Sequence, residues 1–117
     1  MSMTKIRRGD VLYVGMATTD GKRVIRRPAV VVQNPEVGTR FPNLIVAGVT
    51  SQTEKTGPGR LFVAKKSPEG QAMGLKLDSL VTLDNLATIG TWSVLQVIGH
   101  CPLMGEVDRE LRLILGL

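Results

Sequence analysis

Polar side chains with phosphate-binding chemistry stand at the ends of two apolar, β-branched runs. Arg27 leads into the run at 29–32, and Thr50 follows the run at 44–49. Arginine stays protonated, and its planar guanidinium matches phosphate oxygens, while a nearby hydroxyl can donate to the same anion. This pairing suits phosphoryl chemistry in which protein donors stabilise the developing charge. A structural interpretation stays open beside it, in which Arg27 pairs with an acid and Thr50 caps a turn.

Residue types and spacing argue against several other chemistries. His100 is the only histidine, which excludes a two-histidine acid–base ribonuclease. Cys101 follows it directly, so in a strand the two side chains would point to opposite faces. No second cysteine is present for a disulfide or a zinc site, and no glycine-rich loop has nucleotide-binding spacing. We expect no metal and no cofactor, and a structural role for His100 at a strand end.

The elements that must position Arg27 and Thr50 are mostly short strands. Apolar runs punctuated by Gly, Pro, Asn and Asp predict antiparallel strands, and the polar segments between them predict loops. Pro28 has no N–H for a ladder, so it should begin a strand or lie on an edge. The unbroken apolar run at 29–32 predicts burial on both faces. The predicted strands cover 11–14, 29–32, 44–49, 60–64, 80–83, 86–89 and 95–99, and the predicted loops cover 17–23, 33–43, 51–59 and 65–74.

Only the C-terminal segment has helical periodicity. Val107, Leu111, Ile114 and Leu115 fall on one apolar face, and Gly116 suits a C-cap. Many short strands and one helix predict a mainly β fold (β plus α), a small barrel or sandwich, on which the helix or a second subunit packs.

Size and charge limit the class of protein. The chain has 117 residues, which predicts one domain over 1–117, and a net charge of +5. Residues 1–40 carry eight Lys or Arg against three acids, whereas residues 41–117 carry seven of each. This asymmetry fits a polyanionic or acidic partner as well as it fits a solvated basic face. No run approaches the ~20 apolar residues of a membrane span, and residues 1–8 do not resemble a signal peptide, so we expect a cytoplasmic protein that binds no membrane.

Five motifs occur in an order that resembles one family, the MazF/PemK toxins of bacterial toxin–antitoxin systems. The opening Arg-Gly-Asp-Val-Leu-Tyr-Val at 8–14 and the Arg-Pro-Ala-Val-Val-Val-Gln-Asn at 27–34 are similar to family motifs. So are Val-Thr-Ser at 49–51 and the stretch from Gly-Leu through Asp-Ser at 74–89. Ile98-Gly99 and the terminal helix complete the likeness, which covers nearly the whole chain.

This resemblance implies a fold, an activity and partners. The fold would be an SH3-like small barrel of the CcdB/MazF type, assembled as a homodimer. The activity would be that of an mRNA interferase, a metal-independent endoribonuclease that cuts single-stranded RNA. A 2′-hydroxyl would attack the adjacent phosphate and leave 2′,3′-cyclic phosphate and 5′-hydroxyl ends. An acidic cognate antitoxin would wrap the dimer, and Arg27 and Thr50 would be the catalytic pair.

Further residues are predicted to bind the RNA through loop polar groups, because the aromatic residues are too few for extensive base stacking. The family often has Arg and Asp where Ala87 and Gly90 stand here, so its RNA sequence preference does not carry over. No general base for the 2′-hydroxyl is identified. The predicted RNA-binding residues are Lys22, Arg23, Arg26, Ser51, Gln52, Lys55, Asp84 and Asn85.

Two other functions stay open from the sequence. One is a non-catalytic SH3-like module that binds RNA or an acidic peptide, and the other is a relative that poisons a topoisomerase by binding. A binding module would tolerate Thr50→Val, whereas the nuclease would not.

Overall fold

The computed structural model describes residues 5–38 and 40–117. Half of the predicted N-terminal segment at 1–8, and position 39 of the predicted loop at 33–43, lie outside the described residues. None of the described helices is long and apolar enough to span a bilayer. The elements in chain order are β1 (Asp10–Ala17), β2 (Val24–Val31), β3 (Asn43–Thr50), β4 (Arg60–Val63), α1 (Pro68–Ala72), β5 (Ser79–Gly90), the 3-10 turn η1 (Thr91–Ser93), β6 (Val94–His100) and α2 (Met104–Leu115).

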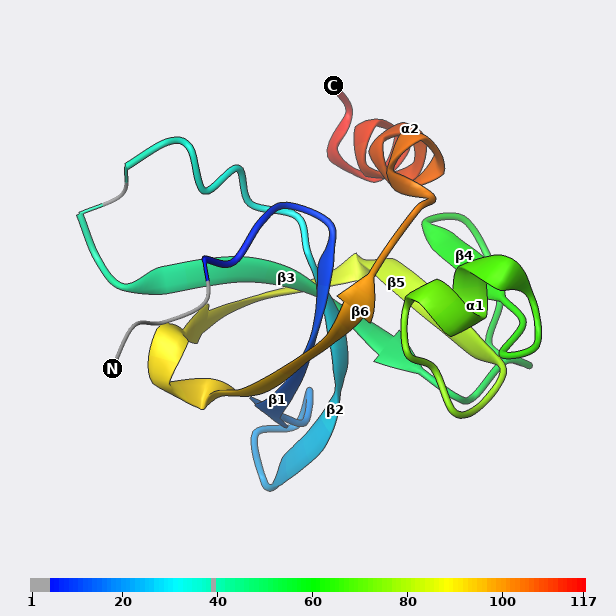
Figure 1. The fold of residues 1–117 in the computed structure, drawn as a ribbon, viewed down its shortest axis with the longest axis horizontal. Coiled ribbons are helices and arrows are strands. Elements are labelled where there is room, and N and C mark those ends of the chain that lie inside the picture. The colour runs from blue at the N-terminus through cyan, green and yellow to red at the C-terminus, as the bar shows by residue number, and fades with distance from the viewer. Residues whose placement is uncertain (1–4, 39) are drawn as a thin grey trace.

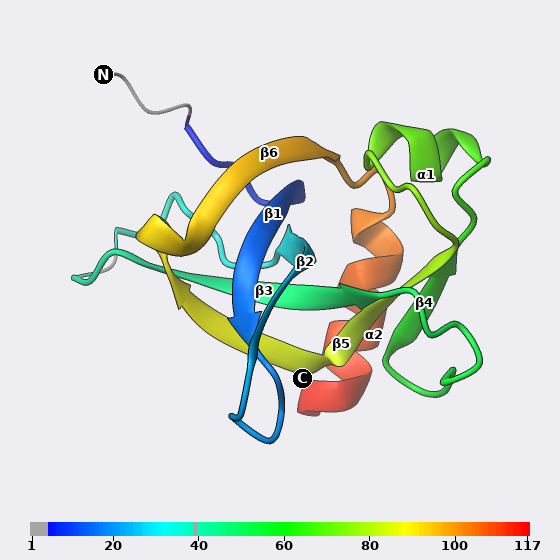
Figure 2. The same ribbon diagram turned by 90° about the horizontal axis from the view of Figure 1, so that it is seen from below.

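Six antiparallel strands form one curled sheet in the order β4-β5-β3-β2-β1-β6. The first strand therefore lies between the second and the last. Figures 1 and 2 show the curl of the sheet. The two edge strands, β4 and β6, are not hydrogen-bonded to each other, so the barrel stays open. The mainly β class with a C-terminal helix is confirmed.

The curl of the sheet gives it two apolar cores, one on each face. Ala29, Val30 and Val31 of β2 are all fully buried, as the unbroken apolar run predicts. Alternate side chains of a strand point to opposite faces. Val30 accordingly joins the cluster beneath α2, while Ala29 and Val31 join the cluster inside the curl. This burial holds β2 rigidly behind Arg27.

Pro28 lies within β2 rather than at its start, in part against expectation. Residues 24–28 pair with β1 only, and pairing with β3 begins at Ala29. The N-terminal half of β2 is therefore locally an edge, where a residue without an N–H costs no ladder bond. The unpaired side of this half strand leaves room for a cleft.

One long strand, β5, replaces the two strands predicted at 80–83 and 86–89. The Asp84-Asn85 pair, which suggests a turn, lies inside this strand. Its pairing with β3 skips three residues there, because Thr82 faces Gly48 and Leu86 faces the adjacent Ala47. The polar pair thus forms a bulge, which bends the strand without ending it.

The predicted loop at 65–74 was wrong in part, because it contains the short helix α1. The Ser67 hydroxyl accepts from the Gly70 N–H at 2.9 Å, and Pro68 occupies the first helical position. Five residues are too few to show helical periodicity. The helix ends at Ala72, and Gly74 follows shortly after it with a φ of +72°, which favours glycine.

The predicted C-terminal helix is confirmed as α2. Val107 is fully buried, Leu111 packs on the core, and Gly116 caps the helix with φ +71°. Leu115 is 52% exposed, so the predicted apolar face is buried chiefly in the first two turns. Ile114 lies against Gly59, which places the last turn of the helix beside the loop between β3 and β4.

Candidate functional site

A cleft of about 580 Å³ opens where the free half of β2 meets the end of β3. Its other walls come from β1, β6 and the segment that joins α1 to β5. Segments far apart in the sequence therefore build it. Among the described residues that line it are Arg26, Arg27, Thr50, Ser51, Gln52 and Lys76, and no Asp or Glu.

Arg27 is half-buried in this cleft and has no ion pair or hydrogen bond within the described residues. The interpretation in which it pairs with an acid therefore does not hold there. Its neighbour Arg26 is exposed and also lines the cleft. Arg26 and Arg27 are consecutive in β2, so their side chains leave opposite faces of the strand. No described carboxylate lines the cleft to balance their charge, and unbalanced positive charge attracts an anion. The site is arranged to receive negative charge.

Thr50 lines the same cleft at the last residue of β3. Its hydroxyl oxygen accepts from the backbone N–H of Gln52 at 3.2 Å, so it does cap a turn as the structural interpretation holds. A hydroxyl can accept and donate at once. The hydroxyl proton of Thr50 therefore stays available for donation to an oxygen of a bound anion.

The other predicted RNA-binding residues divide into two groups. Ser51 and Gln52 line the cleft beside Thr50. Lys22 and Arg23 are exposed at the β1–β2 hairpin, outside the lining. In that hairpin, the Thr18 hydroxyl and the Lys22 N–H donate to Asp20 and lower the pKa of its carboxyl.

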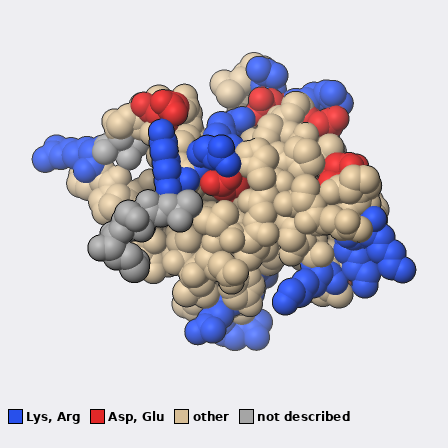
Figure 3. All heavy atoms as spheres, in the orientation of Figure 1, with Lys and Arg blue, Asp and Glu red and all other residues tan. Residues whose placement is uncertain are grey.

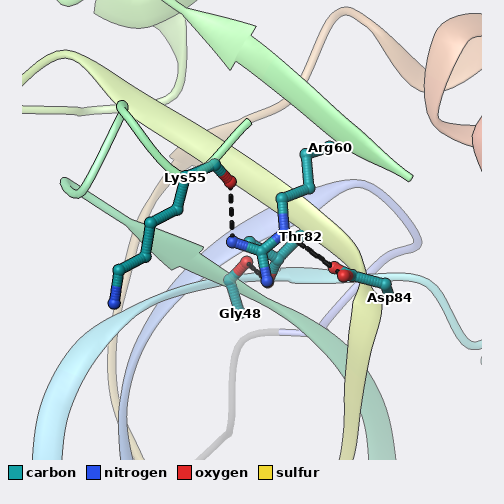
Figure 4. Close-up of polar contacts among 5 residues, drawn as sticks. All are labelled: Gly48, Lys55, Arg60, Thr82 and Asp84. Atoms are coloured by element: carbon teal, nitrogen blue, oxygen red, sulfur yellow. Dashed lines mark hydrogen bonds and ion pairs between the residues drawn. The ribbon is translucent and has the colours of Figure 1, made fainter. Parts of the chain in front are cut away.

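Lys55, Asp84 and Asn85 also lie outside the lining. Asp84 is engaged in an ion pair with Arg60 at 3.1 Å, and the carbonyl of Lys55 accepts from the same guanidinium (Figure 4). Their predicted contact with RNA stays a prediction, and the geometry gives Asp84 a partner within the chain.

Sequence reasoning missed four polar groups of the cleft. Lys76, Ser79, Tyr13 and Gln96 come from the segment before β5, from β5 itself, from β1 and from β6. Lys76 lies two residues after the end of the predicted loop at 65–74, and a basic residue in that position was a usable signal. No sequence signal indicated Gln96, because only the pairing of β6 with β1 brings this residue to the cleft.

Positive charge is spread over the molecule, and part of it lies near the cleft. Figure 3 shows one blue group at the β1–β2 hairpin and another where the β3–β4 and α1–β5 loops lie, while further blue groups lie among the red groups in the upper half of that view. Within residues 5–38 and 40–117, no three His, Cys, Asp or Glu side chains gather as they would to hold a metal ion.

His100 and Cys101 both lie away from the cleft lining. His100 Nδ1 lies 3.1 Å from the Asp10 carboxylate, which also accepts from the Arg7 N–H at 2.8 Å. This contact ties the end of β6 to the start of β1 and fits the predicted structural role. Cys101 follows the end of β6 and is buried in the cluster beneath α2, where desolvation raises the pKa of its thiol.

The chain is thus a small β protein with a curled antiparallel sheet and a basic cleft whose charge suits a negatively charged ligand. The chain belongs to the family of PemK-like, MazF-like toxins of type II toxin–antitoxin systems, whose sequence model matches residues 7–115. A comparison with curated protein sequences finds no match.

Solved structures share the fold at low sequence identity. An endoribonuclease from a mycobacterial species, in complex with its cognate antitoxin, is 22% identical with a TM-score of 0.71, and 97% of each chain is covered. MazF from Deinococcus radiodurans is 19% identical with a TM-score of 0.73, over 96% of this chain and 97% of that chain. Toxin MazF-mt6 of Mycobacterium tuberculosis is 19% identical with a TM-score of 0.70, over 92% and 97%.

Proposed function

We propose that this chain is the toxin of a type II toxin–antitoxin pair and acts as an endoribonuclease on single-stranded RNA. The substrate backbone lies in the cleft and needs no metal or cofactor for its cleavage. Family membership and the fold shared with endoribonuclease toxins support the proposal. The half-buried Arg27, which has no partner within the described residues and lines the same cleft as Thr50, is the observation that carries it.

The proposed reaction is an internal transfer of the phosphate. The 2′-hydroxyl loses its proton, the bond from O2′ to phosphorus forms, and the bond from phosphorus to O5′ breaks. The products are a 2′,3′-cyclic phosphate and a 5′-hydroxyl, after O5′ takes up a proton. Arg27 holds the phosphorane oxygens with its fixed guanidinium, and Thr50 donates to the same phosphate. A preorganised donor of this kind typically contributes about 3 kcal/mol to the transition state.

The test is cleavage of a long single-stranded RNA in EDTA by the wild type, Arg27→Ala and Thr50→Val. The wild type should cut at a recurring short sequence, and both variants should lose activity. Polynucleotide kinase should label the new 5′ ends without prior phosphatase treatment, because they carry hydroxyls. Thr53→Val is the matched control, since Thr53 is half-buried nearby but does not line the cleft.

One result would contradict the nuclease, and another would contradict the catalytic role of Thr50. RNA binding without cleavage by any of the proteins would indicate a non-catalytic binding module. Full activity of Thr50→Val would leave Thr50 as the turn cap that the Gln52 contact shows.

We further propose a cytoplasmic, single-domain protein over 1–117 that forms a homodimer and is inhibited by an acidic antitoxin. The edge strand β6 supports a second copy, because Leu95 and Val97 on it are 52% and 37% exposed. The basic cleft supports an acidic segment as inhibitor, since the same charges would attract it. Size-exclusion chromatography with light scattering tests the dimer, and mixing with an acidic antitoxin peptide tests the inhibition.

A further inference from the structure

The loop between β3 and β4, residues 51–59, is held at its centre by one guanidinium. Arg60, the first residue of β4, directs Nε at the two carboxylate oxygens of Asp84, at 3.1 and 3.2 Å. Its Nη1 donates to the carbonyl oxygen of Lys55 at 3.0 Å. Figure 4 shows Arg60 between these two partners. One side chain therefore ties the middle of the loop to the bulge of β5.

The C-terminal end of this loop is fixed by other contacts. At its end, the Leu83 N–H donates to the Gly59 carbonyl at 2.7 Å, and Ile114 of α2 covers Gly59. Among the described residues, the Arg60 bond to Lys55 is the only hydrogen bond that joins residues 53–56 to the chain outside the loop. The centre of the loop thus depends on Arg60.

A chain of hydrogen bonds leads from Arg60 to the cleft. The Lys55 N–H donates to the Gln52 carbonyl at 3.1 Å, and the Gln52 N–H donates to the Thr50 hydroxyl at 3.2 Å. Gln52 and Thr50 line the cleft, whereas Arg60 does not. A displacement of Lys55 would therefore reach the polar groups that meet the RNA.

We propose that Arg60 and Asp84 are positioning residues, which hold the loop so that Gln52 and the Thr50 hydroxyl stay oriented toward the RNA. This inference rests on the proposed function. It gives Asp84 a role other than the direct RNA contact predicted from the sequence. The ion pair is partly exposed, with side-chain exposures of 23% for Arg60 and 35% for Asp84, so solvent screens part of its attraction.

Arg60→Met tests the proposal, and Arg8→Met is its matched control. Arg8 makes the same kind of bridge, to the Asp108 carboxylate at 2.7 Å and to the Val32 carbonyl at 2.8 Å, but both of its partners lie outside the β3–β4 loop. Its side-chain exposure of 32% is similar. Methionine keeps the length of the side chain and removes its charge and donors.

The first measurement is limited proteolysis with trypsin after Lys55, which needs no RNA. A released loop opens more often, so cleavage there should be about tenfold faster in Arg60→Met, the effect of losing one charge-assisted hydrogen bond. Arg8→Met should match the wild type at this site. Equal cleavage of Arg60→Met and wild type would overturn the proposal.

The second measurement is the affinity for an RNA with a single 2′-deoxy nucleotide at the scissile position, which cannot be cut by the proposed reaction. Arg60→Met should bind it about tenfold more weakly, with an unchanged dependence on salt. A direct phosphate contact would instead lower the log–log salt slope by about 0.7 on removal. That lower slope would identify Arg60 as an RNA-binding residue and overturn the positioning role.

The two proposals fail in distinguishable ways. A wild type that neither cuts nor binds RNA refutes the proposed function, while the trypsin experiment still decides whether Arg60 holds the loop.

If Arg60→Met does not fold, Asp84→Asn replaces it as the test variant, because Asp84→Asn removes the charge pair and leaves the Arg60 bond to Lys55. It should raise cleavage after Lys55 by about threefold. No change in that variant would overturn the proposal.

Discussion

Removal of Arg27 should lower activity without lowering stability. The Arg27 side chain has no hydrogen bond or ion pair within the described residues, so Arg27→Met leaves no partner unsatisfied. Arg26 and Lys76 line the same cleft, and the loss of one of these like charges relieves repulsion. We expect the free energy of unfolding to stay within about 0.5 kcal/mol of the wild type or to rise slightly. A native ion-pair arginine would behave in the opposite way.

The loss of activity should be large. An oxyanion donor is worth about 3 kcal/mol, which corresponds to a fall of about 100-fold or more in the rate of the chemical step. Single-turnover cleavage of a short RNA in EDTA measures this rate, and urea unfolding measures stability. Arg8→Met should show the reverse pattern, because its two hydrogen bonds at 2.7 and 2.8 Å join α2 to the end of β2. Its stability should fall by about 1–2 kcal/mol with activity retained.

Two results would refute this reasoning about Arg27. A loss of stability in Arg27→Met as large as that in Arg8→Met would show that Arg27 serves the fold. A cleavage rate within about threefold of the wild type would remove it from the transition state, since so small a ratio corresponds to well under 1 kcal/mol.

Three further changes test the packing of the fold. Gly59→Ala should lower the free energy of unfolding, measured in urea, by about 1–2 kcal/mol. The reason is that Gly59 has a φ of +82°, and an added Cβ would lie 2.6 Å from the Ile114 side chain. An unchanged urea midpoint would contradict this prediction. Thr82→Val should lower the free energy of unfolding by about 1 kcal/mol in the same assay, because the buried Thr82 hydroxyl donates to the Gly48 carbonyl at 2.6 Å. A variant more stable than the wild type would refute this prediction. Cys101 should resist alkylation until the protein unfolds. Because burial raises the pKa of its thiol above 9.0, the unfolded chain ionises first, so Cys101→Ala should remove part of the fall in stability seen above that pH.

The placement of the catalytic candidates could be predicted because it follows from local pattern. The apolar runs around Arg27 and Thr50 indicated two buried strands, and each residue stands where a strand meets the cleft. The continuity of β5 could not be predicted, since Asp84 and Asn85 resemble a turn until pairing with β3 absorbs them as a bulge. Sequence also gave no sign that Arg60 would engage Asp84, 24 residues further along the chain.

The position of β1 between β2 and β6 has a consequence for how the activity arises during synthesis. Tyr13 on β1 and Gln96 on β6 line the same cleft, so its walls meet only after the last strand has emerged from the ribosome. Pairing between the first and last strands is a long-range contact, which forms slowly compared with hairpins. A nascent chain that already exposes Arg27 and Thr50 therefore lacks a complete cleft. The strand order therefore delays formation of the complete cleft until translation of the chain is nearly finished.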